Sequence, residues 1–399
     1  MRIRPLHIAG TNSERTKAHN RRVVLGYMQR NGGAGRAEIA RSSGLSTQTV
    51  SNLIAELEGE GLVVAAGRRR SERGQPPIVY AFNPDAAAAL GFEVRPDALV
   101  MVLTNLGGSV LVQRQLPLAS AAPDAVFALM AELAQAERQA APGRRIIGAG
   151  LVIPGPFGVE GLSAAGDTVL PDWGGLDAAG RAGAALSMPV LLEKDATAAA
   201  IAERHSGVAQ GLDSYCYIYF GAGLGLGVVA HGLPQRGAFG NAGELGHVIV
   251  RPGGLVCDCH NRGCLEQYAS RVALLRHLSA RGLPVAGATA DDAALALLAA
   301  GDRALSLWLD DAAAALSQAV GLLENLFDPQ AVILGGALPD ALLDELIARL
   351  ALPPGSVARR TGRVLPRVLR GASGPATAAL GGAALVIHDT VTPRLDLTA

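Results

Sequence analysis

Three cysteines and one histidine lie close enough in the sequence to bind one metal ion. Cys257, Cys259 and Cys264 fall within eight residues, and His247 comes ten residues before the first of them. Three thiolates and one imidazole form a closed set of four ligands, which is typical of a structural zinc site and not of a catalytic one. His260 competes for the fourth position, but it lies between two of the cysteines and has little freedom to reach the same ion. A metal-free cluster of buried cysteines is the alternative.

An acid at residue 195 is the second candidate for chemistry. Asp195 follows the apolar stretch 190–192 and precedes the alanine-rich segment 196–205, so it is expected where a strand ends and a helix begins. A carboxylate at such a junction can accept a hydrogen bond from a ligand hydroxyl or act as a general base. Aspartate is also favoured as the N-cap of a helix, and the sequence supports the two interpretations equally.

Four glycines alternate with other residues in the segment 221–227, directly after a predicted strand. Such a run lets a ligand approach the backbone closely and can present N–H groups to a phosphate or a hydroxyl. It is as often structural, and its spacing fits neither the dinucleotide-binding fingerprint nor the P-loop. The run is therefore weak evidence by itself.

These residues need a scaffold, and the pattern beyond residue 83 predicts an α/β fold. Strand-like segments alternate with helix-like segments, which argues for sheets covered by helices. The expected strands are 98–103, 109–116, 146–153, 190–192, 214–220 and 226–230, and the expected helices are 123–141 and 196–205.

The first 82 residues have the pattern of a helix-turn-helix. Helices are expected at 14–31 and 36–43, the second ending at Gly44, and Ser46 is a suitable N-cap for a third. Apolar residues recur in the third helix at i, i+3, i+4 and i+7 and so share one face, namely Val50, Leu53, Ile54 and Leu57. The polar residues opposite this face and on its shoulders are candidates to contact base edges in the major groove. They are Thr47, Gln48, Thr49, Ser51 and Asn52.

Two short apolar strands, 62–65 and 78–82, flank a basic loop that predicts the wing of a winged helix. Its arginines are expected to contact phosphates or the minor groove; they are Arg68, Arg69, Arg70 and Arg73. Residues 1–82 contain 13 Lys and Arg against 6 Asp and Glu, whereas the rest of the chain contains 22 against 29. A basic module on an acidic body predicts double-stranded DNA as the partner. A three-helix interaction module with a charged hairpin is the alternative.

Length and composition set the remaining bounds. A chain of 399 residues with 49% hydrophobic residues is expected to fold into two or three domains. No signal peptide or membrane-spanning run is expected, so a cytoplasmic location is predicted. Cys216 stands apart from the other three cysteines, which favours metal binding over a disulfide framework.

Together these residues resemble the ROK family, which groups repressors, open reading frames and sugar kinases. The glycine run, the segment 240–247 and the cysteine cluster resemble the family's signature region. The helix-turn-helix resembles the repressor branch, to which the xylose and N-acetylglucosamine repressors belong. The resemblance implies an α/β fold with an N-terminal winged helix-turn-helix (1–82) followed by a two-lobed, actin-like ATPase (sugar kinase) fold. We expect a small lobe at 83–195, to which a C-terminal helix at 375–389 returns, and a large lobe with the zinc site at 196–374.

The resemblance also implies roles for individual residues. His247, Cys257, Cys259 and Cys264 match zinc ligands, and Gly335-Gly336 resembles part of an adenosine-binding turn. Residues that match positions contacting the sugar are Glu244, His247 and Glu266, and Asp195 matches the catalytic base of the kinases. His247 is thus expected to bind zinc with one ring nitrogen and to face the sugar with the other.

Two departures from the family pattern change the expected function. The kinases carry an Asp-x-Gly-x-Thr phosphate loop, but here the turn contains Arg95-Pro96 and lacks that Gly and Thr. ATP binding is therefore not expected, the chain is predicted not to be an enzyme, and Asp195 is expected to be a vestigial base that contacts the effector. Lys194 stands where the family usually has Asn, so it is expected to contact the effector, for which an acidic or phosphorylated sugar is one candidate.

The combined expectation is a sugar-responsive transcriptional repressor, a homodimer or homotetramer with structural zinc. The first alternative is an ATP-dependent sugar kinase with a DNA-binding appendage. The second is a regulator whose body binds a protein partner instead of a sugar.

Overall fold

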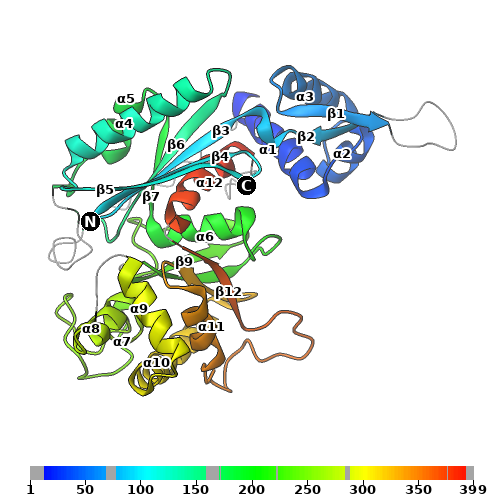
Figure 1. Ribbon diagram of the computed structural model, residues 1–399. Coiled ribbons are helices and arrows are strands. Elements are labelled where there is room, and N and C mark those ends of the chain that lie inside the picture. The colour runs from blue at the N-terminus through cyan, green and yellow to red at the C-terminus, as the bar shows by residue number, and fades with distance from the viewer. Residues whose placement is uncertain are drawn as a thin grey trace, which may run out of the picture.

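The computed structural model describes residues 13–68, 78–158, 170, 172–221, 223–283, 288–374 and 376–391. Within these ranges the chain forms an N-terminal unit with a two-stranded sheet, followed by two five-stranded sheets (Figure 1). Among the described helices, none is both long enough and apolar enough to cross a membrane.

The N-terminal unit is a winged helix-turn-helix. Its elements are α1 (Ser13–Asn31), α2 (Arg36–Ser43), α3 (Thr47–Gly59), β1 (Val63–Arg68) and β2 (Ile78–Phe82). The side chain of Ser46 accepts a hydrogen bond from the N–H of Thr49 and caps α3, while Gly44 ends α2 at a φ of 70°. Val50, Leu53, Ile54 and Leu57 are all buried, so the predicted apolar face of the third helix is confirmed.

The first sheet has the strand order β5-β4-β3-β6-β7. Its strands are β3 (Ala88–Val94), β4 (Ala98–Asn105), β5 (Val110–Pro117), β6 (Ile146–Ile153) and β7 (Val190–Lys194). β3, β4 and β5 form an antiparallel meander, and β6 and β7 run parallel to β3. α4 (Pro123–Ala140) and α5 (Ala178–Leu186) cover one face of this sheet.

The second sheet repeats this topology in the order β10-β9-β8-β11-β12. Its strands are β8 (Tyr215–Phe220), β9 (Leu224–Ala230), β10 (Leu233–Pro234), β11 (Val332–Gly336) and β12 (Val368–Ser373). Its outer helices are α7 (Glu266–Ala269), α8 (Arg271–Ser279), α9 (Ala288–Ala299), α10 (Arg303–Phe327) and α11 (Asp340–Ala348). The duplicated arrangement confirms the predicted α/β architecture.

Two equivalent helices lie between the sheets. α6 (Asp195–Ser206) follows the last strand of the first sheet, and α12 (Thr377–Val391) follows the last strand of the second. They pack on each other, and α12 also contacts β3 and β6 (Figure 1). The C-terminal helix thus returns to the first sheet, where it also contacts α1.

Candidate metal centre, ligand site and DNA interface

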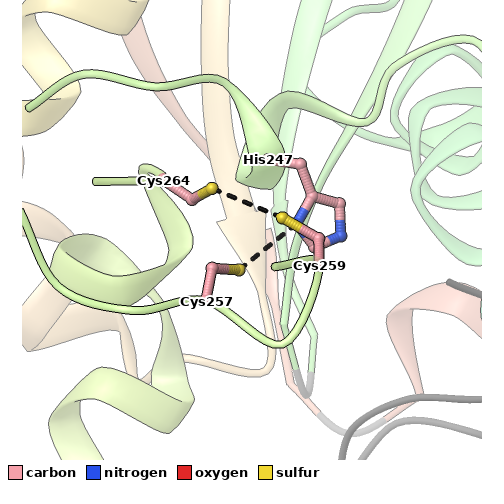
Figure 2. A group of neighbouring side chains, drawn as sticks. All are labelled: His247, Cys257, Cys259 and Cys264. Atoms are coloured by element: carbon pink, nitrogen blue, oxygen red, sulfur yellow. Dashed lines mark hydrogen bonds between the residues drawn. The ribbon is translucent and has the colours of Figure 1, made fainter. Parts of the chain in front are cut away.

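The predicted metal ligands converge on one point. The nitrogen of His247 and the sulfurs of Cys257, Cys259 and Cys264 all lie within 4.8 Å of one another. His247 Nδ1 is 3.6 Å from Cys257 Sγ, and Cys259 Sγ is 3.6 Å from Cys264 Sγ (Figure 2). A tetrahedral zinc ion with Zn–S bonds of about 2.3 Å needs sulfurs roughly 3.7 Å apart. The residues therefore fit a four-coordinate ion.

The loop that carries the cysteines is shaped for this convergence. A Cβ on Gly263 would lie 1.7 Å from the carbonyl oxygen of Arg251, and Gly263 has a φ of 87°, so no other residue fits there. His260 is exposed at a φ of 66° and is not part of the ligand group. Burial raises the pKa of the Cys264 thiol well above its usual range, and a bound divalent cation would favour the thiolate instead.

Arg251 fixes this loop to the large helix α10. Its guanidinium donates to both carboxylate oxygens of Asp311, at 2.6 and 3.1 Å, and lies 4.2 Å from the ring centroid of Tyr268. The hydroxyl of Tyr268 in turn accepts a hydrogen bond from the N–H of Leu255 at 2.9 Å. Planar, bidentate contacts of this kind set orientation as well as energy, so the loop is held in one position against the second sheet.

Asp195 is the first residue of α6, directly after β7. The N-cap position belongs to Lys194, so the N-cap interpretation of Asp195 is wrong by one residue. One carboxylate oxygen of Asp195 accepts the N–H of Ala196 at 2.7 Å. Burial raises the pKa of Asp195 to about 7, and the nearby charges of Glu93 and Glu244 add to that shift.

Lys194 is paired within the protein. Its side chain is 2% exposed, and its ammonium donates to Glu244 Oε1 at 2.9 Å and to the carbonyl oxygen of Ala242 at 2.7 Å. A Cβ on Gly155 would lie 2.5 Å from the lysine Cδ, so this glycine leaves room for the stem. The charge of Lys194 is therefore neutralised by Glu244, and the contact of Lys194 with an effector stays a prediction.

Glu266 begins α7, two residues after Cys264. Its Oε2 accepts the N–H of Leu224 at 3.2 Å, and a Cβ on Gly223 would lie 2.2 Å from the same oxygen. Burial raises the pKa of Glu266, while the charge of His247 lowers it. The glycine run thus serves close packing: Gly223 makes room for Glu266, and Gly227 lies against the backbone of α6.

The turn between β3 and β4 is filled by an ion pair. Arg95 donates to the two oxygens of Glu93 at 2.9 and 2.7 Å, and the glutamate is 5% exposed. The hydroxyl of Tyr219 lies 3.5 Å from Glu93. Gly335 is also closely packed, since a Cβ there would lie 2.3 Å from the hydroxyl of Tyr217.

The candidate DNA-contacting residues of α3 differ in how far their side chains are exposed to solvent. Thr47, Gln48 and Asn52 are exposed, whereas Thr49 and Ser51 are half-buried. Gln48 Nε2 donates to Asn52 Oδ1 at 3.0 Å, so these two amides form one polar unit on the outer face. Arg68 is exposed at the end of β1; Arg69, Arg70 and Arg73 lie outside the described residues.

Two further basic residues lie beside α3 that the sequence pattern does not single out. Arg36 and Arg41 of α2 line a hollow of about 440 Å³ together with Thr47. Arg36 also donates to the hydroxyl of Tyr80 at 2.7 Å. Their spacing in a short helix carries no distinctive signal, because the hollow forms only when β2 packs beside α2.

Comparisons with known proteins agree with both parts of the fold. The ROK family profile matches residues 90–389, and a winged helix-turn-helix DNA-binding profile matches residues 18–64. The xylose repressor of Bacillus subtilis (strain 168) is 29% identical over 267 residues, covering 66% of this chain and 69% of the repressor.

Solved structures are similar over even more of the chain. A ROK family transcriptional regulator described as a homologue of the E. coli MLC protein has a TM-score of 0.74 and 25% identity, covering 94% of this chain and 98% of the regulator. A ROK hexokinase from Thermus thermophilus has a TM-score of 0.59 and 29% identity, covering 74% of this chain and 97% of the hexokinase.

Proposed function

Since the chain belongs to the ROK family and begins with a winged helix-turn-helix, we propose that it is a transcriptional repressor that binds operator DNA and responds to a sugar. The observation that carries the proposal is the exposed face of α3. It presents Gln48 and Asn52 away from a buried apolar stripe, on a unit joined to a sugar-kinase-like body. Side-chain amides are suited to bidentate contacts with adenine in the major groove.

We propose that the effector is a neutral polyhydroxylated sugar. Burial raises the pKa of both Asp195 and Glu266, and the charge of Glu244 adds to both shifts, so the three carboxyl groups interact electrostatically. Carboxylates accept hydrogen bonds from hydroxyls, and Lys194 is already neutralised by Glu244. A zinc ion with three thiolates and one imidazole adds one net negative charge beside His247. An acidic or phosphorylated sugar would be repelled by this set.

Within this proposal Lys194 acts through Glu244. By holding one oxygen of Glu244, it orients the other for a ligand. His247 would bind zinc through Nδ1, leaving Nε2 for the effector. The zinc would therefore hold both the loop and one effector-binding side chain in place, without taking part in a reaction.

A repressor of this kind needs two DNA-binding units, because an operator with two half-sites is matched by a symmetric dimer. We propose that the active species is a homodimer or a homotetramer.

Sugar kinase activity is the second candidate, favoured by the similarity to the Thermus hexokinase and by Asp195 at the start of α6. Against it stands the turn between β3 and β4, where the Arg95 guanidinium pairs with Glu93. Phosphoryl transfer depends on donors positioned around the phosphates, and a proline at residue 96 has no N–H to offer.

Two measurements on the full chain test the proposal. A duplex selected by the protein from a random library is first used to measure operator affinity. That affinity is then measured with D-xylose, other neutral monosaccharides and their phosphates. Neutral sugars are expected to change the affinity and the phosphates to leave it unchanged. A protein that selects no duplex would contradict the repressor proposal, and a response confined to phosphates would contradict the effector class.

A further inference from the structure

We infer that the winged helix-turn-helix and the first sheet form one cooperative body, joined by α12, and that the DNA-binding unit is not a separately tethered module. The inference rests on the proposed function only in taking α3 as the DNA-binding helix. The attachment of the DNA-binding unit to the first sheet can be tested without DNA or sugar.

The first evidence is a shared hydrophobic core. Val24, Leu25 and Met28 of α1 belong to the same continuous cluster of buried side chains as Ile387 and Val391 of α12. All five are at most 2% exposed, and α1 contacts α12 (Figure 1). Separate modules on a linker would each close their own core, whereas here one core crosses the boundary.

The connection between the unit and the sheet is also fixed by hydrogen bonds. Asn83 donates its backbone N–H to Leu62 O and its side-chain amide to Gly61 O, both at 2.9 Å. Asp85 then accepts from the side chain of Asn105 at the end of β4, at 2.7 Å. The short connection is thereby bonded to the turn between α3 and β1 on one side and to the first sheet on the other.

α12 sits on the first sheet too closely to slide. A Cβ on Gly91 of β3 would lie 1.9 Å from Ala379 O, and a Cβ on Gly150 of β6 would lie 2.0 Å from Gly382 O. Backbone meets backbone at both points. No flexible side chain lies between the helix and the sheet at these two points, so a shift of α12 requires a shift of the sheet.

The same helix is in direct backbone contact with α6. A Cβ on Gly381 would lie 2.1 Å from the carbonyl oxygen of Ala198, one turn after Asp195. A displacement at the start of α6 is therefore passed to α12 at this contact. Because α12 is fixed to both the first sheet and α1, the DNA-binding unit turns together with that sheet, relative to the second sheet.

Hydrogen exchange of the full chain tests the shared body. Ile387 is completely buried at the seam, whereas Ile218 is completely buried in the core of the second sheet. Ile387→Ala removes the same atoms as the control Ile218→Ala, and each leaves a cavity. Ile387→Ala is expected to speed amide exchange at least about 30-fold in α1, α3 and β3 alike, and less than about twofold in α10. Ile218→Ala is expected to give the reverse pattern.

Three outcomes would overturn the inference. They are unchanged exchange in α1 and α3 after Ile387→Ala, a wild-type DNA-binding unit that exchanges independently of β3, and equal effects of the two variants on α1. Should Ile387→Ala not fold, Ile387→Val and Ile218→Val are compared in the same way, with expected changes of about 2- to 12-fold. Failure to bind DNA or sugar would bear on the proposed function and leave this pattern unaltered.

Discussion

Lys194 Nζ lies 2.9 Å from Glu244 Oε1, and this ion pair connects the end of β7 in the first sheet to the segment that leads into His247, a candidate metal ligand. Both residues belong to the candidate ligand site, and each determines what the other can do there. Glu244 is 31% exposed, so one end of the pair is buried and the other can meet a ligand.

Removing the side chain of Lys194 is expected to destabilise the protein, because Glu244 would lose the partner that neutralises its charge. Lys194→Met should lower the free energy of unfolding by about 2 kcal/mol, less than the 3–5 kcal/mol of fully buried pairs. The double variant Lys194→Met/Glu244→Gln should recover part of that loss. The control is Arg281→Met, which breaks the more exposed pair with Asp302 and should cost at most about 1 kcal/mol. Urea denaturation measures all four proteins; equal losses in Lys194→Met and Arg281→Met would contradict the prediction.

The raised pKa of Asp195 predicts a pH dependence of stability with a definite sign. Its folded pKa is about 7, and in the unfolded chain it is about 3.9. Between these values the folded state holds a proton that the unfolded chain has released, so the free energy of unfolding falls as pH rises from about 4 to 7 and levels off above.

Asp195→Asn is expected to abolish this contribution, becoming more stable than the wild type by on the order of 4 kcal/mol at pH 8 and equal to it near pH 4. Comparing the two proteins at each pH removes contributions that they share, such as that of His388, whose pKa burial lowers to about 4. The same variant should weaken sugar binding by about 10- to 150-fold while leaving sugar-free operator binding intact. A constant stability difference from pH 4 to 8 would show that Asp195 does not titrate in this window.

One zinc per chain is expected in the purified protein. Cys257→Ser, Cys264→Ser and His247→Ala should lose it and destabilise the segment 243–268, because a closed thiolate site contributes folding energy directly. His260→Ala and Cys216→Ala are the matched controls and should retain the metal, since neither residue belongs to the ligand group. Elemental analysis by mass spectrometry gives the answer, and well under one zinc per wild-type chain would contradict the site.

DNA binding is expected to weaken steeply as the salt concentration rises. Variants at base-contacting residues and at phosphate-contacting residues are expected to affect it differently. Gln48→Ala should relax sequence preference, whereas Arg69→Ala should weaken all duplexes and reduce the slope of affinity against salt by about one. Gln318→Ala, an exposed glutamine on α10, is the control and should leave both unchanged. Fluorescence anisotropy at several salt concentrations suffices, and a chain lacking residues 1–82 that bound as tightly would refute the assignment.

No useful kinase activity is expected. With ATP and a panel of hexoses and amino sugars, a coupled ADP-release assay should give turnover well below about 1 s⁻¹, the lower end of the ordinary kinase range. A Thermus-type ROK hexokinase in the same assay provides the positive control. Sugar-dependent turnover at or above that rate would favour the enzyme over the repressor.

Local signals in the sequence predicted local structure well. The cap of α3, the glycine that ends α2 and the four-ligand group all depend on residues close together in the chain, so their spacing is enough. β3 carries no alternation to detect, because every one of its residues is buried. The helices from α7 to α11 were likewise not predicted from the residues themselves.

The relationships that the sequence could not predict span long separations. Lys194 and Glu244 meet only because β7 ends opposite the segment after β10, and nothing in either residue's neighbourhood specifies that register. The same holds for the contact of α1 with α12. The pairing of Lys194 with a carboxylate of the protein itself is therefore visible only in the fold, and its contact with an effector stays a prediction.

The return of α12 to the N-terminal unit has a consequence for how the protein is made. The winged helix leaves the ribosome well before the helix that completes its core, because that helix begins only at Thr377. At about 5–20 residues per second, roughly 15 s to a minute pass between synthesis of the winged helix and synthesis of α12. During this interval α12 is not available to cover the apolar side of α1, so a nascent chain exposes that surface until α12 has been made. The DNA-binding unit is thus joined to the first sheet only once α12 has been made, and a chain that ends before α12 lacks this connection.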